Sequence, residues 1–313
     1  MNSLIVATNV VFPLIVLIAV GYMAGAFRWI SNESFSQFNK LVFNILLPCV
    51  LFENVYNVSL DEILNLKLII FGLCSVFAVF LACIPVSGLV TREPSKRGVI
   101  LMGSFRSNVV LYGFPIVQSM YARELLAPVS VLIAVIVPVF NVLGVISLEM
   151  FRSGKISVNK ILLNIVKNPM IIGTAAGILC SVSGFEMPQI LRGSLSNITA
   201  AATPVALIIL GGTFKRQTVG DNRKYLIAIS SLRLLIVPAV FLCIAIPLGF
   251  RNVELLALVA LLGSPAAVSS YSMARQMGAD SELAGQNLLF TTVFSIPTIF
   301  LWVSLLNHFG YIV

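Results

Sequence analysis

Long apolar runs separated by short polar stretches account for most of this sequence. Ten runs are apolar over about 20 residues, the length at which a helix crosses the ~30 Å hydrocarbon core of a bilayer. They lie near residues 4–27, 36–57, 67–90, 98–121, 125–149, 162–184, 192–213, 225–249, 254–275 and 283–308. The pattern predicts an all-α integral membrane protein with ten transmembrane helices, numbered here as spans 1 to 10.

The composition supports this fold class. Of the 313 residues, 58% are hydrophobic and only 10% are charged, whereas a soluble domain carries about 25% charged residues. A soluble fold could not cover so much apolar surface, but lipid solvates the outside of a helical bundle. No basic leader precedes residues 4–27 and no A-x-A cleavage site is evident, so we expect a span here and no cleaved signal peptide.

Candidate ligands for metals and cofactors are scarce. The five cysteines lie in apolar stretches and His308 is the single histidine, so we predict no metal site and no cofactor. The sequence has no P-loop, H-E-x-x-H or G-x-S-x-G motif, and we therefore expect no catalytic residues and no enzyme activity.

The distribution of basic residues predicts the orientation. The net charge is +8, but the basic residues lie mostly in short loops between spans, which explains them without a nucleic-acid partner. One set of loops carries Arg28, Arg92, Lys96, Arg97, Arg152, Lys155, Lys160, Lys215, Arg216, Arg223, Lys224 and Arg275, and the other carries Lys67, Arg123, Arg192 and Arg251. The positive-inside rule places the first set in the cytoplasm. We expect a multi-pass protein of the plasma or inner membrane with both termini outside the cytoplasm.

Prolines recur at matching positions in two halves of the chain. The matches are Pro13 and Pro48 with Pro169 and Pro204 (35 residues within each pair), and Gly113-Phe114-Pro115 with Gly263-Ser264-Pro265 (150 positions apart). We therefore divide the chain into a first five-span repeat at 1–150, a cytoplasmic linker at 151–161 and a second repeat at 162–313. Because five is odd, the second repeat enters the membrane from the opposite side, as in the inverted repeats of many secondary transporters.

Spans 4 and 9 are the most polar and the most interrupted by glycine and proline. Proline removes a backbone donor, and irregular backbone survives at membrane depth only inside protein or beside a water-filled cavity. We expect span 4 to break at Gly113–Pro115 and span 9 at Gly263–Pro265. Where the broken spans cross, free N–H groups and helix N-termini would attract an anion.

Several polar residues on these spans are candidates for that site. Arg106 and Asn108 precede the expected break in span 4, with snorkelling and a helix–helix hydrogen bond as their structural alternatives. Arg233 and Glu53 fit structural and interfacial roles better. The polar face of span 10 could support the break in span 9 or hold a cation. The predicted binding residues are Arg106, Asn108, Tyr112, Gly113, Pro115, Ser264, Pro265, Ser269, Ser270, Tyr271 and Asn44, and the predicted polar face of span 10 is Gln286, Asn287 and Thr291.

The sequence resembles the auxin efflux carrier family, which includes plant PIN proteins and bacterial malate and malonate permeases. The resemblance covers essentially the whole chain. The motifs that carry it are Arg106-Ser107-Asn108 followed by Gly113-Phe114-Pro115-Ile116, the stretch PAAVSSYSMARQMGADSELA from Pro265 to Ala284, Ser295-Ile296-Pro297-Thr298, and Asn44-Ile45-Leu46-Leu47-Pro48.

This resemblance implies a bile-acid-symporter-like (NhaA-like) fold of two inverted five-helix repeats. It implies a scaffold of spans 1, 2, 6 and 7, a transport core of spans 3–5 and 8–10, and a homodimer formed through the scaffold. It further implies that Asn108 contacts substrate at the crossing of spans 4 and 9. The PIN crossover proline of span 9 falls near Ser270, where this chain has no proline, and the long cytoplasmic loop of many PIN proteins is absent.

Taken together, these features favour a secondary transporter of small organic anions, such as carboxylates or auxin-like acids, working by alternating access. An anion channel, a transporter-fold sensor and an intramembrane enzyme are the alternatives. Neither the substrate nor a coupling ion, H⁺ or Na⁺, follows from the sequence.

The orientation can be tested by labelling single cysteines in intact cells with a membrane-impermeant reagent. We expect cysteines placed at 91–97, 151–161 and 214–224 to react only after the membrane is permeabilised. Strong labelling of the 151–161 loop in intact cells would contradict the predicted topology.

Overall fold

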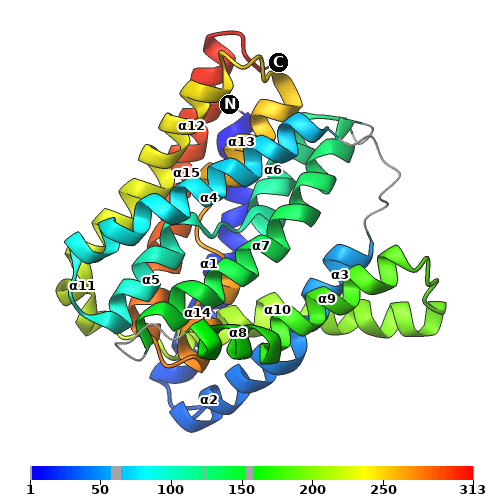
Figure 1. Ribbon diagram of the computed structural model, residues 1–313. Helices are drawn as coiled ribbons and strands as arrows, with labels where there is room; N and C mark the ends of the chain where they lie inside the picture. The colour runs from blue at the N-terminus through cyan, green and yellow to red at the C-terminus, as the bar shows by residue number, and fades with distance from the viewer. Residues whose placement is uncertain (1, 58–64, 123–124, 153–157, 313) are drawn as a thin grey trace.

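The computed structural model describes residues 2–57, 65–122, 125–152 and 158–312 of the chain, and within these ranges the regular structure is helical. The predicted linker at 151–161 is covered only at its edges, and Arg123 and Lys155 lie outside the described residues. The α-helices, labelled in Figure 1 where space allows, are α1 (Asn2–Ala26), α2 (Asn32–Leu41), α3 (Leu47–Tyr56), α4 (Leu66–Val90), α5 (Pro94–Phe105), α6 (Phe114–Met120), α7 (Ala127–Arg152), α8 (Val158–Lys167), α9 (Pro169–Val182), α10 (Gln189–Gly212), α11 (Val219–Ser231), α12 (Val237–Ala245), α13 (Asn252–Gly263), α14 (Val268–Gln276) and α15 (Ser281–His308).

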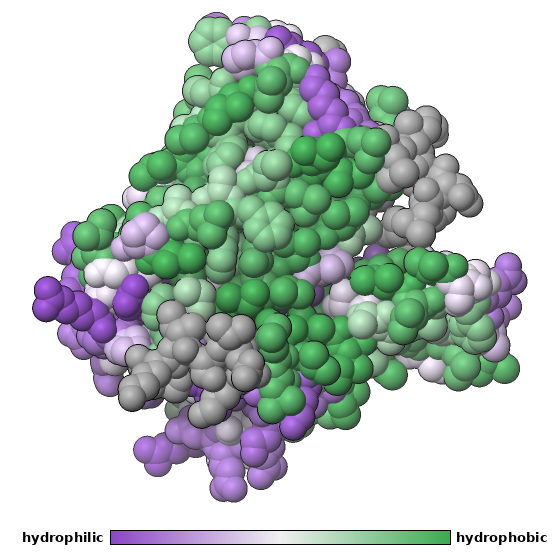
Figure 2. Space-filling view, viewed as in Figure 1, coloured by the Kyte–Doolittle hydropathy of each residue, from purple (hydrophilic) through white to green (hydrophobic). Residues whose placement is uncertain are grey.

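The helices have the length and surface of a membrane bundle. Among the described residues, six helical segments are long and apolar enough to span a membrane, and four shorter apolar helices accompany them. Figure 2 shows hydrophobic residues over most of the visible face, with hydrophilic residues gathered at its ends. Both chain termini lie at the same end of the molecule (Figure 1). In lipid such helices satisfy their backbone groups by hydrogen bonds within each segment.

The predicted span near 162–184 is divided into two helices. α8 ends at Lys167, and α9 begins at Pro169. The side chain of Asn168 caps α9 by accepting a hydrogen bond from the Met170 N–H at 3.0 Å. A proline in the first turn of a helix loses no hydrogen bond, because the first N–H groups have no intrahelical partner.

Three prolines follow π-helical turns. The sequence pattern did not predict these turns. The turns are Val42–Leu46 before Pro48, Val109–Gly113 before Pro115, and Leu232–Ile236 before Pro238. A π turn contains one extra residue, so the helix can continue past a residue that has no N–H and a bulky ring. The expected break of span 4 at Gly113–Pro115 is therefore wrong, since Pro115 lies in the first turn of α6, directly after a π turn.

Two helices are broken, and the broken segments cross. Span 4 leaves helical geometry at Arg106–Asn108, between α5 and the π turn, and the expected break of span 9 is present at Ser264–Ala267, between α13 and α14. Ser107 pairs with Ala266 in an isolated antiparallel bridge, and the Asn108 N–H donates to the Pro265 carbonyl at 2.8 Å. As a result α6 and α13 lie toward the end that carries the termini, and α5 and α14 toward the other end (Figure 1).

The polar face of α15 supports this crossing. The Thr291 hydroxyl accepts the Ala266 N–H at 3.1 Å, so a backbone donor that the break releases is satisfied inside the bundle. The sequence analysis considered two roles for the polar face of span 10, support of the break in span 9 and binding of a cation. The contact of Thr291 with Ala266 supports the break.

Arg233 joins the two broken helices. It is only 1% exposed, and its guanidinium donates to the carbonyls of Phe105 at 3.0 Å, Leu261 at 2.9 Å and Ser264 at 2.9 Å. These carbonyls belong to the C-terminal ends of α5 and α13, where the last carbonyls of a helix have no intrahelical partner and the helix dipole is negative. A single buried cation therefore satisfies both ends, which gives Arg233 a structural role.

Glycines allow two pairs of helices to pack closely. Gly21 and Gly25 of α1 lie directly against the α10 backbone, and Gly173 and Gly177 of α9 lie directly against the α3 backbone. A β-carbon at any of the four positions would come within 2.7 Å of a backbone oxygen. Both pairs have the G-x-x-x-G spacing that brings membrane helices together.

Replacing Arg233 with glutamine should destabilise the fold. The change leaves at least two buried carbonyls without a donor, at about 1–3 kcal/mol each, so we expect the melting temperature of the detergent-purified protein to fall by roughly 5 °C or more. Arg223→Gln is the matched control, because Arg223 is an exposed arginine of α11, the helix that leads into the π turn with Arg233. Equal melting temperatures for the two variants would contradict the role assigned to Arg233.

Candidate functional site

A cavity of about 280 Å³ lies beside the crossing. One wall comes from the broken segments of spans 4 and 9 and from α7, and the other comes from α3, α9 and α10. The polar side chains that line it are Arg106, Ser107, Asn108, Asn141 and Ser269 on the first wall, and Glu53, Asn54, Ser196, Thr199 and Thr203 on the second. It extends from the crossing toward the end at which α3 stops and α10 begins.

Arg106 is a buried cation without a carboxylate partner in the described part of the chain. Its side chain is held by neutral groups: Asn141 Oδ1 at 2.6 Å, Ser269 Oγ at 2.9 Å and Met273 Sδ at 2.6 Å. The residue is 3% exposed, so it points into the bundle and does not snorkel to the interface. Burying a charge is costly unless a counter-charge accompanies it, and the cavity provides the space for one.

Asn108 and Ser269 carry polar groups from the two broken spans into the same cavity. Asn108 is the last residue of the break of span 4, and its side chain makes no hydrogen bond to another described residue. Ser269 lies in the first turn of α14, where the free N–H groups of a helix start add positive potential. Arg106, Asn108 and Ser269, all predicted from the sequence, are thus brought together.

The opposite wall carries a polar stripe that the sequence analysis missed. Ser196, Thr199 and Thr203 follow one another at helical spacing along α10, which puts them on one face. The Thr199 hydroxyl donates to the Glu53 carboxylate. That spacing in an apolar span was the signal that could have revealed this wall. Asn141 gave a similar signal, as the single amide of the span near 125–149.

The other predicted residues lie outside the cavity. Ser264 and Pro265 belong to the crossing itself, where their carbonyls accept from Arg233 and Asn108. Tyr112, Gly113, Pro115 and Ser270 do not line the cavity, nor does Asn44, whose amide donates to the Lys40 carbonyl of its own helix at 2.9 Å. A β-carbon on Gly113 would come within 2.9 Å of Ala260, so Gly113 allows α13 to pack closely.

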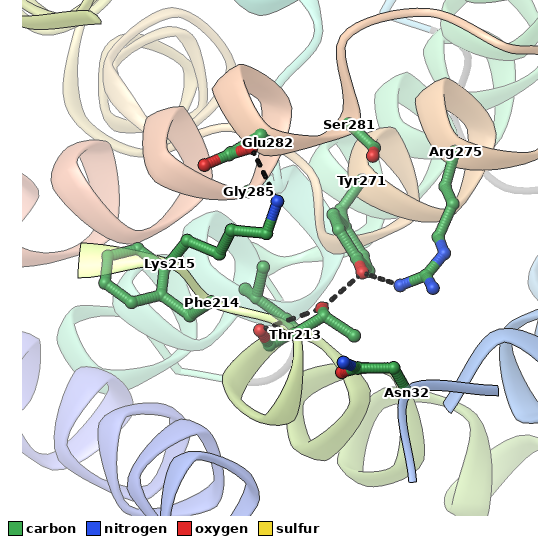
Figure 3. A pocket seen from close by; sticks show the side chains of 10 residues that line it. Asn32, Thr213, Phe214, Lys215, Tyr271, Arg275, Ser281, Glu282 and Gly285 are labelled. Carbon is green, nitrogen blue, oxygen red and sulfur yellow. Dashed lines mark hydrogen bonds and ion pairs between the residues drawn. The ribbon is translucent and has the colours of Figure 1, made fainter. Parts of the chain in front are cut away.

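Tyr271 lies in a second, polar cavity of about 230 Å³ near the other end of the molecule. Its hydroxyl is 2.5 Å from the Thr213 hydroxyl at the end of α10 and accepts from Arg275 at 2.6 Å (Figure 3). Beside it, Lys215 pairs with Glu282 of α15 at 3.5 Å. These polar contacts join the end of α10 to α14 and α15, while the first cavity lies toward the opposite end.

Comparison with known proteins identifies the family. A sequence model of the family described as "Membrane transport protein" matches residues 6–159 and residues 153–303, which together span most of the chain. An uncharacterised transporter of Methanocaldococcus jannaschii is 24% identical over 304 residues, which cover 94% of this chain and 97% of that protein.

Two other relatives differ in what their names say. A protein of Rhizobium meliloti named "Putative malonate transporter" is 22% identical over 93% of each chain. The "Lysosomal cholesterol signaling protein" of Mus musculus is 26% identical over 231 residues, which are 66% of this chain but only 25% of that larger protein. With its apolar helices and the two family matches, this chain is a multi-pass membrane protein of the membrane transport protein family, the auxin efflux carrier family that its motifs resemble.

Proposed function

We propose that this protein is a secondary transporter that binds a small organic anion in the cavity beside the crossing of spans 4 and 9. The observation that carries the proposal is Arg106, a buried arginine with only neutral partners that faces a cavity. A carboxylate there would supply the missing counter-charge. Asn108 and Ser269 add a neutral amide and a hydroxyl that can hydrogen-bond it. The name of the Rhizobium relative agrees with a substrate that carries a carboxylate, although malonate itself is a dicarboxylate.

Transport by alternating access agrees with the unequal ends of the bundle. The cavity reaches from the crossing toward one end, while Thr213, Tyr271 and Arg275 close the other (Figure 3). In this proposal spans 1, 2, 6 and 7 form the scaffold and spans 3–5 and 8–10 the moving core. The bonds of Tyr271 and Lys215 then join scaffold to core and must break when access changes sides.

A ten-span, inverted-repeat architecture underlies this mechanism. Six long segments and four shorter apolar helices together make ten. The G-x-x-x-G pairs support the repeat, because Gly21 and Gly25 of span 1 correspond to Gly173 and Gly177 of span 6, each 152 positions later. We further propose a homodimer formed through the scaffold. The protein resides in the plasma or inner membrane, with both termini outside the cytoplasm. Transport is either coupled to H⁺ or Na⁺ or uncoupled from both ions.

Removing the Asn108 amide should weaken substrate binding without unfolding the protein. A lost buried hydrogen bond costs about 1–3 kcal/mol, so we expect Asn108→Ala to reduce carboxylate affinity roughly tenfold. Arg106→Gln should reduce it further, because the counter-charge is lost. A thermal-shift screen against carboxylates, with and without Na⁺, provides the measurement.

Asn44→Ala is the control for this screen, since Asn44 lies outside the cavity and bonds only within its own helix. Unchanged affinity in both Asn108→Ala and Arg106→Gln would remove the crossing from the binding site.

Tyr271→Phe should loosen the closed end. The substitution removes the bonds to Thr213 and Arg275 but keeps the ring, and a loss of about 1 kcal/mol shifts an open–closed equilibrium roughly fivefold. Leu210 lines this end and is 2% exposed. In a chain without its native cysteines, a cysteine introduced by Leu210→Cys should therefore react about fivefold faster with a water-soluble maleimide when Tyr271→Phe is also present.

Tyr22→Phe, at an exposed site, is the control for this labelling. Equal labelling rates with and without Tyr271→Phe would show that the Tyr271 hydroxyl does not hold this end closed.

A further inference from the structure

Two charges of opposite sign line the substrate cavity, one on each wall. Among the cavity-lining residues, Arg106 at the crossing and Glu53 in the last turns of α3 are the two that carry a full charge. The sequence pattern favoured an interfacial role for Glu53, but the fold places this carboxylate in the same cavity as Arg106.

Neither charge has a charged partner within the described chain. Arg106 is held by an amide, a hydroxyl and a thioether, and the Glu53 carboxylate accepts from the Thr199 hydroxyl. The ion pairs of the described residues involve other groups. Two other polar groups lie near Glu53. Cys49 is one helical turn before it, and Arg192 donates to the Tyr56 hydroxyl at 3.5 Å and lies over the Tyr56 ring. The Glu53 carboxylate oxygens can therefore accept a further hydrogen bond from a group in the cavity.

Apolar side chains line the cavity as well. Val50 and Leu51 contribute from α3, Val137 and Phe140 from α7, and Leu111 from the π turn of span 4. They suit the hydrocarbon part of a ligand, because apolar surface there is removed from water. The cavity, at about 280 Å³, suits a small molecule.

We infer that the substrate carries one carboxylate, which binds Arg106 and Asn108, and a hydrogen-bond donor, ammonium or hydroxyl, which binds Glu53. This inference rests on the proposed function. A dicarboxylate would pair with Arg106 but bring a second negative charge into a cavity that already holds the Glu53 carboxylate, and like charges repel. A short amino- or hydroxy-carboxylate satisfies both walls, so Glu53 acts as a specificity-determining residue against dicarboxylates.

The test compares ligands of matched length on the purified full-length protein in lipid nanodiscs at pH 8, where an ordinary carboxyl group is ionised. One set is succinate, 4-aminobutyrate and 4-hydroxybutyrate, and a shorter set is malonate, β-alanine and 3-hydroxypropionate. In at least one set we expect the amino or hydroxy acid to bind at least about tenfold more tightly than the dicarboxylate, the ratio expected for one charge-assisted hydrogen bond. Comparison of the amino and hydroxy acids identifies the donor.

Glu53→Gln provides the decisive variant, because glutamine keeps an acceptor for Thr199 and removes the charge. We expect it to weaken the amino or hydroxy acid and to strengthen the dicarboxylate, so that the ratio between them falls at least about tenfold. Glu33→Gln, at an exposed carboxylate of α2 outside the cavity, should leave the ratio unchanged.

The outcomes separate this inference from the proposed function. If dicarboxylates bind at least as tightly in both sets, or if Glu53→Gln leaves the ratio unchanged, the role of Glu53 is wrong, while loss of binding in Arg106→Gln still supports an anion site. If no ligand of either set binds, or if binding is indifferent to Arg106→Gln, the proposed site is overturned and the inference with it.

Discussion

Breaking a helix inside a membrane releases backbone groups that lipid cannot satisfy, at a cost of several kcal/mol each, and the rest of this structure depends on how that cost is met. Arg233 donates to three carbonyls at the ends of α5 and α13. The released N–H groups of Asn108 and Ala266 bond Pro265 and Thr291. Because the broken ends are satisfied by each other and by neighbouring spans, the irregular backbone is stable at this depth.

The contrast between Arg233 and Arg106 separates a buried charge that the fold compensates from one that it leaves without a counter-charge. Both are almost completely buried. Arg233 is surrounded by carbonyl oxygens at the negative ends of two helices, so its surroundings already compensate its charge. Arg106 has neutral partners and a cavity beside it. Only the second arrangement leaves a place for an anion.

The same crossing relates the proposed anion site to the contacts with α10. α14 begins at the crossing with Ser269 in the first cavity, and it carries Tyr271 and Arg275 in the second cavity. One short helix therefore links the two cavities. A change in the position of either end would be transmitted to the other through this helix.

The amino-acid sequence determined the fold class, since long apolar runs with few charges leave a helical membrane bundle as the stable arrangement. It also indicated the two broken spans, their crossing, and Arg106, Asn108 and Ser269 as cavity residues, because glycine, proline and polar side chains stand out against apolar helices. Tertiary structure decided the rest. Whether Pro115 breaks its helix depended on a π turn, and whether Arg106 snorkels or Glu53 faces a cavity depended on which helices pack beside them. The surroundings of Arg106 and Glu53 include residues far away in the chain, Ser269 and Thr199, and local pattern carries no information about such contacts.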